Sequence, residues 1–363
     1  MYPASLRIKF ARSNGFYEEL KREVLNYFET TQKPSRDHPT MYLKTALMLM
    51  WLAGAYILLV YTAVGFIQGI LCAILLGLAM TGVGFNIQHD ANHDALSKIL
   101  WINRVLGFSL DLLGMSSYVW RWKHNKTHHY YPNIPQVDDD IETNGIGRLA
   151  PLQPHKWFHR FQHIYLWILY AFLLIGWQWI EDFRKIIRGE LKTRKFPERR
   201  VSELVVFILG KLVFVSFALA IPLVFHPWWA VILGCLFVNI VFSASATFIL
   251  QLAHCAEEVQ YTTVDQNTET VAIDWTQHQL NSTVNFAPKN WFLTWFLGGL
   301  NFQIEHHLFP SISHVHYPKI APIVQRMCSR FGLPYHSHRT LRAAVVSHYR
   351  FLKRMGCQTP FYV

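Results

Sequence analysis

The sequence predicts an all-α integral membrane protein with four transmembrane helices, a cytosolic helical cap holding a histidine-rich two-metal centre, and an interfacial helix near residues 164–180. Three observations predict this class. Of the 363 residues, 52% are hydrophobic and only 16% are charged, whereas an ordinary soluble domain has roughly 25% charged residues. The apolar residues form long uncharged stretches, and the 19 histidines include three tight clusters. Residues 1–363 are therefore interpreted as one membrane domain.

The first predicted transmembrane hairpin covers residues 45–87. No charged side chain occurs between Thr45 and Ile87. A helix that spans a bilayer needs about 20 apolar residues, so this stretch holds two helices and a tight turn. The segment Gly65–Gly69 is the predicted turn, because glycine tolerates turn conformations.

The second predicted hairpin covers residues 204–252. Its apolar stretch is interrupted near the middle by Phe225-His226-Pro227-Trp228-Trp229. Proline favours a turn there, which gives one span on each side of it. Lys211 lies close enough to the polar end of the first span for its ammonium group to reach the membrane surface.

Charge outside these stretches predicts the orientation. Lysine and arginine are frequent before residue 45 and again in residues 181–201, whereas neither hairpin turn contains them. By the positive-inside rule, both basic segments are cytosolic. Four crossings then place the N-terminal segment 1–44, the region 88–203 with its interfacial helices, and the cap 253–363 on the same side.

The apolar stretch near residues 164–180 is the ambiguous element. If it crossed the membrane, the basic segment after it would lie on the far side. The aromatic residues of Tyr165–Tyr170 favour an interfacial position instead. A fifth span is the alternative, because the length of the stretch is near the lower limit for crossing.

Three clusters of histidine repeat a helical spacing. The segments HDANH, HNKTHH and QIEHH place donor side chains three or four residues apart, which brings them onto one face of a helix. His254, in FILQLAH, follows the fourth span at the level where His89 follows the second. The nine candidate metal ligands are His89, His93, His124, His128, His129, His254, Gln303, His306 and His307. Nine donors suit two ions with four or five ligands each.

The chemistry expected of such a centre is oxidation. Neither the GxSxG nor the HExxH pattern of common hydrolases occurs, and the five cysteines form no CxxC pair. Histidine-rich ligation with few carboxylates suits a redox metal, with iron as the first choice. The cleavage of an unactivated C–H bond of a bilayer lipid requires such a metal and O2. No nucleic-acid partner is expected, and no catalytic residue beyond the metal ligands is assigned.

The three clusters resemble the histidine boxes of the membrane fatty acid desaturases. The glutamine of QIEHH resembles the front-end type, which places a double bond between an existing one and the carboxyl end. The similarity extends from RIKFARSNGF at Arg7 to HYRFLKRMG at His348, and it is greatest to the cyanobacterial delta-6 acyl-lipid (linoleoyl) enzymes.

The resemblance implies a diiron centre that uses O2 on a fatty acyl substrate, carried on a lipid or on coenzyme A. Zinc is the expected substitute for iron in purified material. No HPGG haem motif occurs, so the expected electron donor is a separate ferredoxin or cytochrome b5. A multi-pass position in a bacterial plasma membrane or cyanobacterial thylakoid membrane follows, with the catalytic face cytoplasmic. The alternatives are a hydroxylase, an acetylenase, a sphingolipid desaturase or other regiospecificity on the same scaffold, and a metal transporter or sensor.

Overall fold

The computed structural model describes residues 8–191, 194–195, 201–265 and 267–357. The described part is mostly helical, and its strands have only two residues each. Four basic residues that contribute to the predicted cytosolic charge lie outside the described residues, namely Arg7, Lys192, Arg199 and Arg200.

The helices lie in the following order along the chain: α1 (Phe16–Thr31), α2 (Pro39–Ile57), α3 (Phe66–Val83), α4 (His89–Asn92), α5 (Leu100–Gly107), α6 (Ser109–Leu112), α7 (Ser117–Trp120), α8 (Gln162–Gly176), α9 (Asp182–Arg188), α10 (Val201–Val215), α11 (Ile221–Phe225), α12 (Trp228–His254), α13 (Trp275–Ser282), α14 (Trp291–Phe296), α15 (Gln303–Leu308), α16 (Tyr317–Phe331) and α17 (Leu341–Met355). The strands are β1 (Lys9–Phe10), β2 (Glu190–Leu191), β3 (Arg194–Lys195), β4 (Val264–Asp265), β5 (Thr270–Val271), β6 (Asn285–Phe286) and β7 (Ser337–His338).

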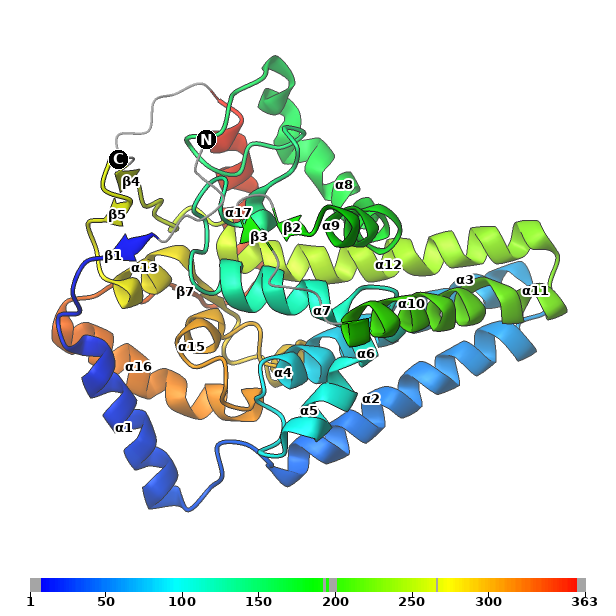
Figure 1. Ribbon diagram of the computed structural model, residues 1–363, viewed down its shortest axis with the longest axis horizontal. Coiled ribbons are helices and arrows are strands. Elements are labelled where there is room, and N and C mark those ends of the chain that lie inside the picture. The colour runs from blue at the N-terminus through cyan, green and yellow to red at the C-terminus, as the bar shows by residue number, and fades with distance from the viewer. Residues whose placement is uncertain (1–7, 192–193, 196–200, 266, 358–363) are drawn as a thin grey trace.

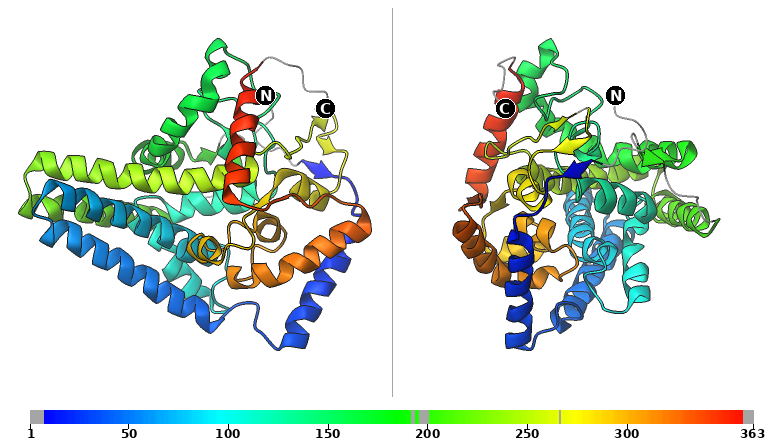
Figure 2. Two further views of the ribbon diagram at one scale, coloured as in Figure 1. Left: turned by 180° about the vertical axis from the view of Figure 1, so that it is seen from behind. Right: turned by 60° about the vertical axis from the view of Figure 1, so that its left-hand side comes forward.

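Four of the long apolar helices form a bundle. The helices α2, α3, α10 and α12 run side by side along the long axis of the molecule (Figures 1 and 2). Large apolar side chains on their outer surfaces are exposed, as at Leu43, Met50 and Leu209, and this arrangement suits contact with lipid. The helical stretches Phe66–Asn92 and Trp228–His254 extend past the predicted hairpin ends at residues 87 and 252, and their ends carry His89 and His254.

The described chain contains five helical stretches that are long and apolar enough to cross a membrane. The fifth, Trp157–Arg188, contains α8. In both figures α8 runs obliquely to the four bundle helices and packs across α12 (Figures 1 and 2). Ser243 of α12 donates a hydrogen bond to the carbonyl oxygen of Tyr170 at 2.6 Å. The protein is thus a multi-pass membrane protein, and the predicted number of four crossings stays a prediction.

The helices α1, α13, α15, α16 and α17 gather at one end of the bundle, together with both ends of the described chain, whereas α11 lies at the opposite end (Figure 1). The N-terminal segment contributes α1, whose side chains Phe16, Leu20, Val24 and Phe28 are buried. Their four-residue spacing forms one apolar stripe, and this stripe packs against α16.

Small strands tie distant segments of this end together. The strand β5 pairs with β1 and β4, β2 pairs with β3, and β6 pairs in parallel with β7. A close backbone approach joins the segment before α15 to the end of α3. Gly298 has φ +58°, and a Cβ atom there would collide with the carbonyl oxygen of Phe85. Asn86 supports the same contact by donating a hydrogen bond to the carbonyl oxygen of Phe296 at 2.8 Å.

Candidate metal centre

The structure brings all nine predicted ligands together, and all nine are buried. His89 and His93 lie where the helix of the second span ends, at α4. The second cluster lies on a π-helical segment, Arg121–His128, and at the residue after it. Gln303, His306 and His307 lie on α15, and His254 is the last residue of α12.

Local helical geometry positions each cluster. The rings of His89 and His93 have centroids 4.8 Å apart. The rings of His124 and His128 are stacked with centroids 5.1 Å apart, as expected for side chains one turn apart on a helix. The rings of His129 and His307, which come from different clusters, are stacked with centroids 4.3 Å apart. The spacing within each cluster therefore places its donor side chains on one helical face, and the tertiary fold brings the separate clusters together.

The histidine nitrogen atoms form three groups, and the third shares one residue with each of the other two. In the first, the nitrogen atoms of His89, His93, His124 and His306 lie within 4.8 Å of one another.

In the second group, the nitrogen atoms of His128, His254 and His307 lie equally close together, and His129 forms a further group with His306 and His307. The side-chain nitrogen of Gln303 lies 2.9 Å from Nε2 of His254. Two adjacent clusters of nitrogen donors, joined by His129, can hold two cations.

Unpaired nitrogen atoms test whether a metal fits this cluster. Among the described residues, Nε2 of His89, His93, His306 and His307 and Nδ1 of His129 are buried without a hydrogen-bond partner. Leaving a buried polar atom unpaired costs roughly 1–3 kcal/mol. A bound cation removes this cost, and an all-nitrogen set suits iron or zinc better than calcium or magnesium. The residues therefore fit a transition metal.

The protonation of the imidazoles agrees with this conclusion. Burial lowers the pKa of His93, His124, His129, His306 and His307 well below the usual value for histidine, and neighbouring imidazoles lower it further. The neutral form of imidazole is the form that binds metal. Nε2 of His124 also lies 3.1 Å from Nε2 of His129. In neutral imidazoles these two nitrogen atoms can both carry lone pairs, and a cation shared by the two rings suits that arrangement.

Hydrogen bonds to the opposite ring nitrogens fix the orientation of several imidazoles. Nδ1 of His307 lies 2.8 Å from the side-chain oxygen of Gln279, and Nδ1 of His254 lies 3.2 Å from the carbonyl oxygen of Ser282. Nδ1 of His306 lies 3.3 Å from the hydroxyl group of Tyr317. Such contacts fix which ring nitrogen faces the metal. No spacing pattern in the sequence predicts these partners, because they lie on segments separate from the clusters.

Carboxylates near the clusters differ in their roles. Asp138 is fully buried and lies 3.1 Å from Nδ1 of His128, as expected of a carboxylate that orients a ligand. Asp140 lies 3.4 Å from the same nitrogen and pairs with Lys123 at 2.6 Å. Asp94 is exposed.

Two other carboxylates bond away from the ligand rings. Glu305 accepts hydrogen bonds from Asn285 and Tyr335, both at 2.8 Å. Burial raises the pKa of Glu305 to about 7. Asp90 lies 2.9 Å from Nδ1 of His314 but 3.8 Å from Nδ1 of His89. These contacts therefore position the polypeptide segments that carry the third and first clusters, and they do not orient the ligand imidazoles.

The comparisons of this chain with known proteins agree with one another. A family model described as fatty acid desaturase matches residues 64–339. An sn-1 linoleoyl-lipid 6-desaturase of Synechocystis sp. is 36% identical over 96% of this chain and 98% of that protein. A protein of the same description from Arthrospira platensis is 35% identical over 98% of this chain and 96% of its own length. An acyl-lipid (8-3)-desaturase of Physcomitrium patens is 33% identical over 97% of this chain and 74% of its own length.

Proposed function

The chain belongs to the fatty acid desaturase family and is an oxidoreductase that desaturates fatty acyl chains, and from this premise we propose that it is an O2-dependent front-end desaturase. The proposed reaction introduces a cis double bond between the carboxyl end and an existing double bond, at position 6 of an acyl chain such as linoleoyl. The observation that carries the proposal is the near full-length similarity to two linoleoyl-lipid 6-desaturases.

The proposed cofactor is a pair of iron ions. His89, His93, His124 and His306 would hold one ion, and His128, His254 and His307 would hold the other, with His129 between them and Gln303 beside His254. When bound, the iron supplies the oxidising power that cleavage of unactivated C–H bonds with O2 requires. In balance, one –CH2–CH2– unit, O2, two electrons and two protons yield –CH=CH– and two water molecules.

The protein's own residues orient the ligands and exclude water. Asp138 holds the ring of His128, and Gln279 holds the ring of His307. Trp120 is buried and stacks on His124 with centroids 4.3 Å apart. This indole gives the first group of histidines an apolar wall, which suits contact with an acyl chain. Such positioning determines which carbon atoms lie next to the reactive centre.

The proposed topology has four crossings, with α8 at the cytosolic interface and the metal centre on the cytoplasmic face. The oblique course of α8 and the basic residues that follow it support this arrangement. We propose that a separate ferredoxin or cytochrome b5 supplies the electrons. The proposed location is a bacterial plasma membrane, or a thylakoid membrane in a cyanobacterium.

Product analysis tests the proposed reaction. The protein is expressed in a host that lacks polyunsaturated lipids, linoleate is supplied, and the acyl chains are analysed by gas chromatography with mass spectrometry. The expected product carries one additional cis double bond on the carboxyl side of the existing ones. A hydroxylated product, or a new double bond on the methyl side, would contradict the proposal.

A further inference from the structure

A basic pocket lies between α14 and the start of α17. It has a volume of about 450 Å³, and Lys289, Asn290, Trp291, Arg339 and Thr340 line it. Lys289 and Arg339 are both exposed. Within the part of the chain that the structure describes, neither cation has a carboxylate partner, and no acidic residue lines the pocket. The pocket therefore presents two uncompensated positive charges.

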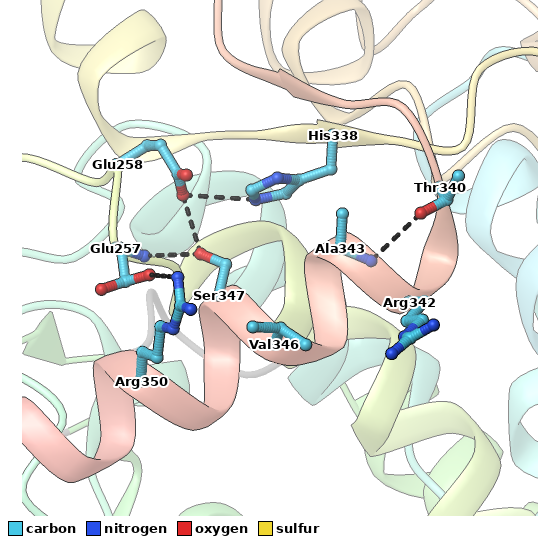
Figure 3. A pocket seen from close by; sticks show the side chains of 9 residues that line it. All are labelled: Glu257, Glu258, His338, Thr340, Arg342, Ala343, Val346, Ser347 and Arg350. Atoms are coloured by element: carbon cyan, nitrogen blue, oxygen red, sulfur yellow. Dashed lines mark hydrogen bonds and ion pairs between the residues drawn. The ribbon is translucent and has the colours of Figure 1, made fainter.

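A neighbouring pocket shows the contrast (Figure 3). It shares Thr340 with the basic pocket but contains Glu257 and Glu258. Glu258 lies 3.2 Å from His338, and Glu257 lies 3.7 Å from Arg350. In Figure 3 these side chains point toward one another. The charges there compensate internally, which leaves the basic pocket as the better anion site.

The basic pocket lies at the level of the membrane surface. Trp291 is 77% exposed and Phe292 is 54% exposed. Phe292 stacks on Phe296 with centroids 6.3 Å apart, and Phe296 contacts Trp51 of the first transmembrane helix with centroids 5.9 Å apart. Exposed aromatic residues beside lysine and arginine are typical of the membrane–water interface. The two cations thus lie where lipid phosphates lie.

Backbone and side-chain hydrogen bonds connect the pocket indirectly to the helix that bears the third cluster. Ala287, which follows β6, donates a hydrogen bond to the carbonyl oxygen of His338 in β7 at 2.8 Å. Asn285, in β6, accepts a hydrogen bond from the backbone of Ile304 in α15 at 2.9 Å. The residues that line the pocket therefore directly follow two paired strands, and one of these strands contacts the helix that bears Gln303, His306 and His307.

We propose that this pocket binds the phosphate group of an anionic glycerophospholipid of the bilayer, the polar head of the lipid that carries the substrate acyl chain. Lys289 and Arg339 would pair with the phosphate, and Thr340 and Asn290, which also line the pocket, would add polar groups beside it. Charged hydrogen bonds to phosphate are stronger than neutral ones. The assignment of the lipid as substrate carrier rests on the proposed function, whereas the binding of its phosphate does not.

Photolabelling tests the binding without any need for activity. The purified full-length protein, in nanodiscs, is exposed to phosphatidylglycerol that carries a photoreactive group on its head, and the labelled peptides are identified by mass spectrometry. Labelling is expected on residues 287–292 and 336–342. The double variant Lys289→Gln/Arg339→Gln should reduce it by roughly tenfold or more. The matched control Arg12→Gln/Lys319→Gln removes the same charge from two other exposed positions and should leave labelling unchanged.

Two further arms separate the alternatives. An excess of unlabelled phosphatidylglycerol should abolish the labelling. Inorganic phosphate at ~50 mM should not, although this concentration is high enough to occupy a site that binds free phosphate. Protection by inorganic phosphate, or unchanged labelling in the double variant, would overturn the headgroup site. With linoleoyl-phosphatidylglycerol as substrate, the double variant should raise KM by roughly tenfold with little change in kcat. An unchanged KM alongside lost labelling would overturn only the substrate assignment.

Discussion

The ammonium nitrogen of Lys44 lies 2.7 Å from Nε2 of His314, and both side chains are buried. The other ring nitrogen of His314 lies 2.9 Å from Asp90, the neighbour of His89 in sequence. The chain Lys44–His314–Asp90 thus connects the first transmembrane helix to the first histidine cluster through the segment after the third. A single lysine therefore joins three separate parts of the fold.

Replacing Lys44 should test this connection. Lys44→Met leaves Nε2 of His314 unpaired in a buried site, and we expect a loss of roughly 1–3 kcal/mol in the free energy of unfolding. Lys44→Gln retains an N–H donor and should lose less. Thermal unfolding of the detergent-purified protein measures both, with the exposed Lys21→Met as the control. Equal losses in the Met and Gln variants would show that the hydrogen bond to His314 is not the cause.

Removing a proposed ligand should abolish activity without affecting membrane insertion. His306 belongs to two groups of donors, one with His89, His93 and His124 and one with His129 and His307, so we expect His306→Ala to reduce desaturation by more than about a hundredfold and to lower the iron content. The control is His226→Ala, because His226 lies in the turn at the opposite end of the bundle and bonds to the carbonyl oxygen of Val60. Substantial activity in His306→Ala would remove the third cluster from the centre.

Asp138 provides a test of ligand orientation. Its carboxylate lies 3.1 Å from His128 and also accepts a hydrogen bond from the backbone of Asn133 at 2.8 Å. Asp138→Asn should weaken metal retention by about 10–100-fold, because the ring of His128 loses a negative partner. Iron remaining after a chelator challenge, measured by elemental analysis, reports this change. The exposed Asp94→Asn is the matched control, and equal retention in both variants would contradict the role of Asp138.

His348 should make the protein less stable in acid. Burial lowers the pKa of His348 to about 4, and its Nδ1 donates a hydrogen bond to the carbonyl oxygen of Cys255 at 2.7 Å. Between pH 6.5 and about 4 the unfolded chain binds a proton that the folded chain does not, so stability falls as the pH falls, by roughly 1 kcal/mol at pH 5.5. The melting temperature should drop between pH 7.5 and 5.5, and His348→Gln should show a smaller drop. An identical drop in the variant would assign the effect to other groups.

The parts that could be predicted depend on local spacing. His89 and His93, like His124 and His128, lie one helical turn apart in sequence, so their convergence on one face follows from helix geometry. His254 could be placed from its position at the end of a span. The turns near Gly65 and Pro227 followed from apolar length and from residues that favour turns.

The parts that could not be predicted depend on tertiary packing. Gln279 and Tyr317 contact His307 and His306 from segments with no spacing relationship to the clusters. Nothing in the sequence connects His314 to Lys44, which it contacts at 2.7 Å. The packing of α1 against α16 also went unpredicted, although its apolar stripe was present in the sequence, because the segment was interpreted from its charge.

The backbone contact between Gly298 and Phe85 limits the amino-acid substitutions that the metal centre tolerates. Main chain meets main chain there, so the separation between the two halves of the histidine assembly is set by backbone dimensions that no substitution of a nearby side chain alters. A Cβ atom at position 298 would collide with the carbonyl group of Phe85, so only glycine allows the two segments to keep this distance.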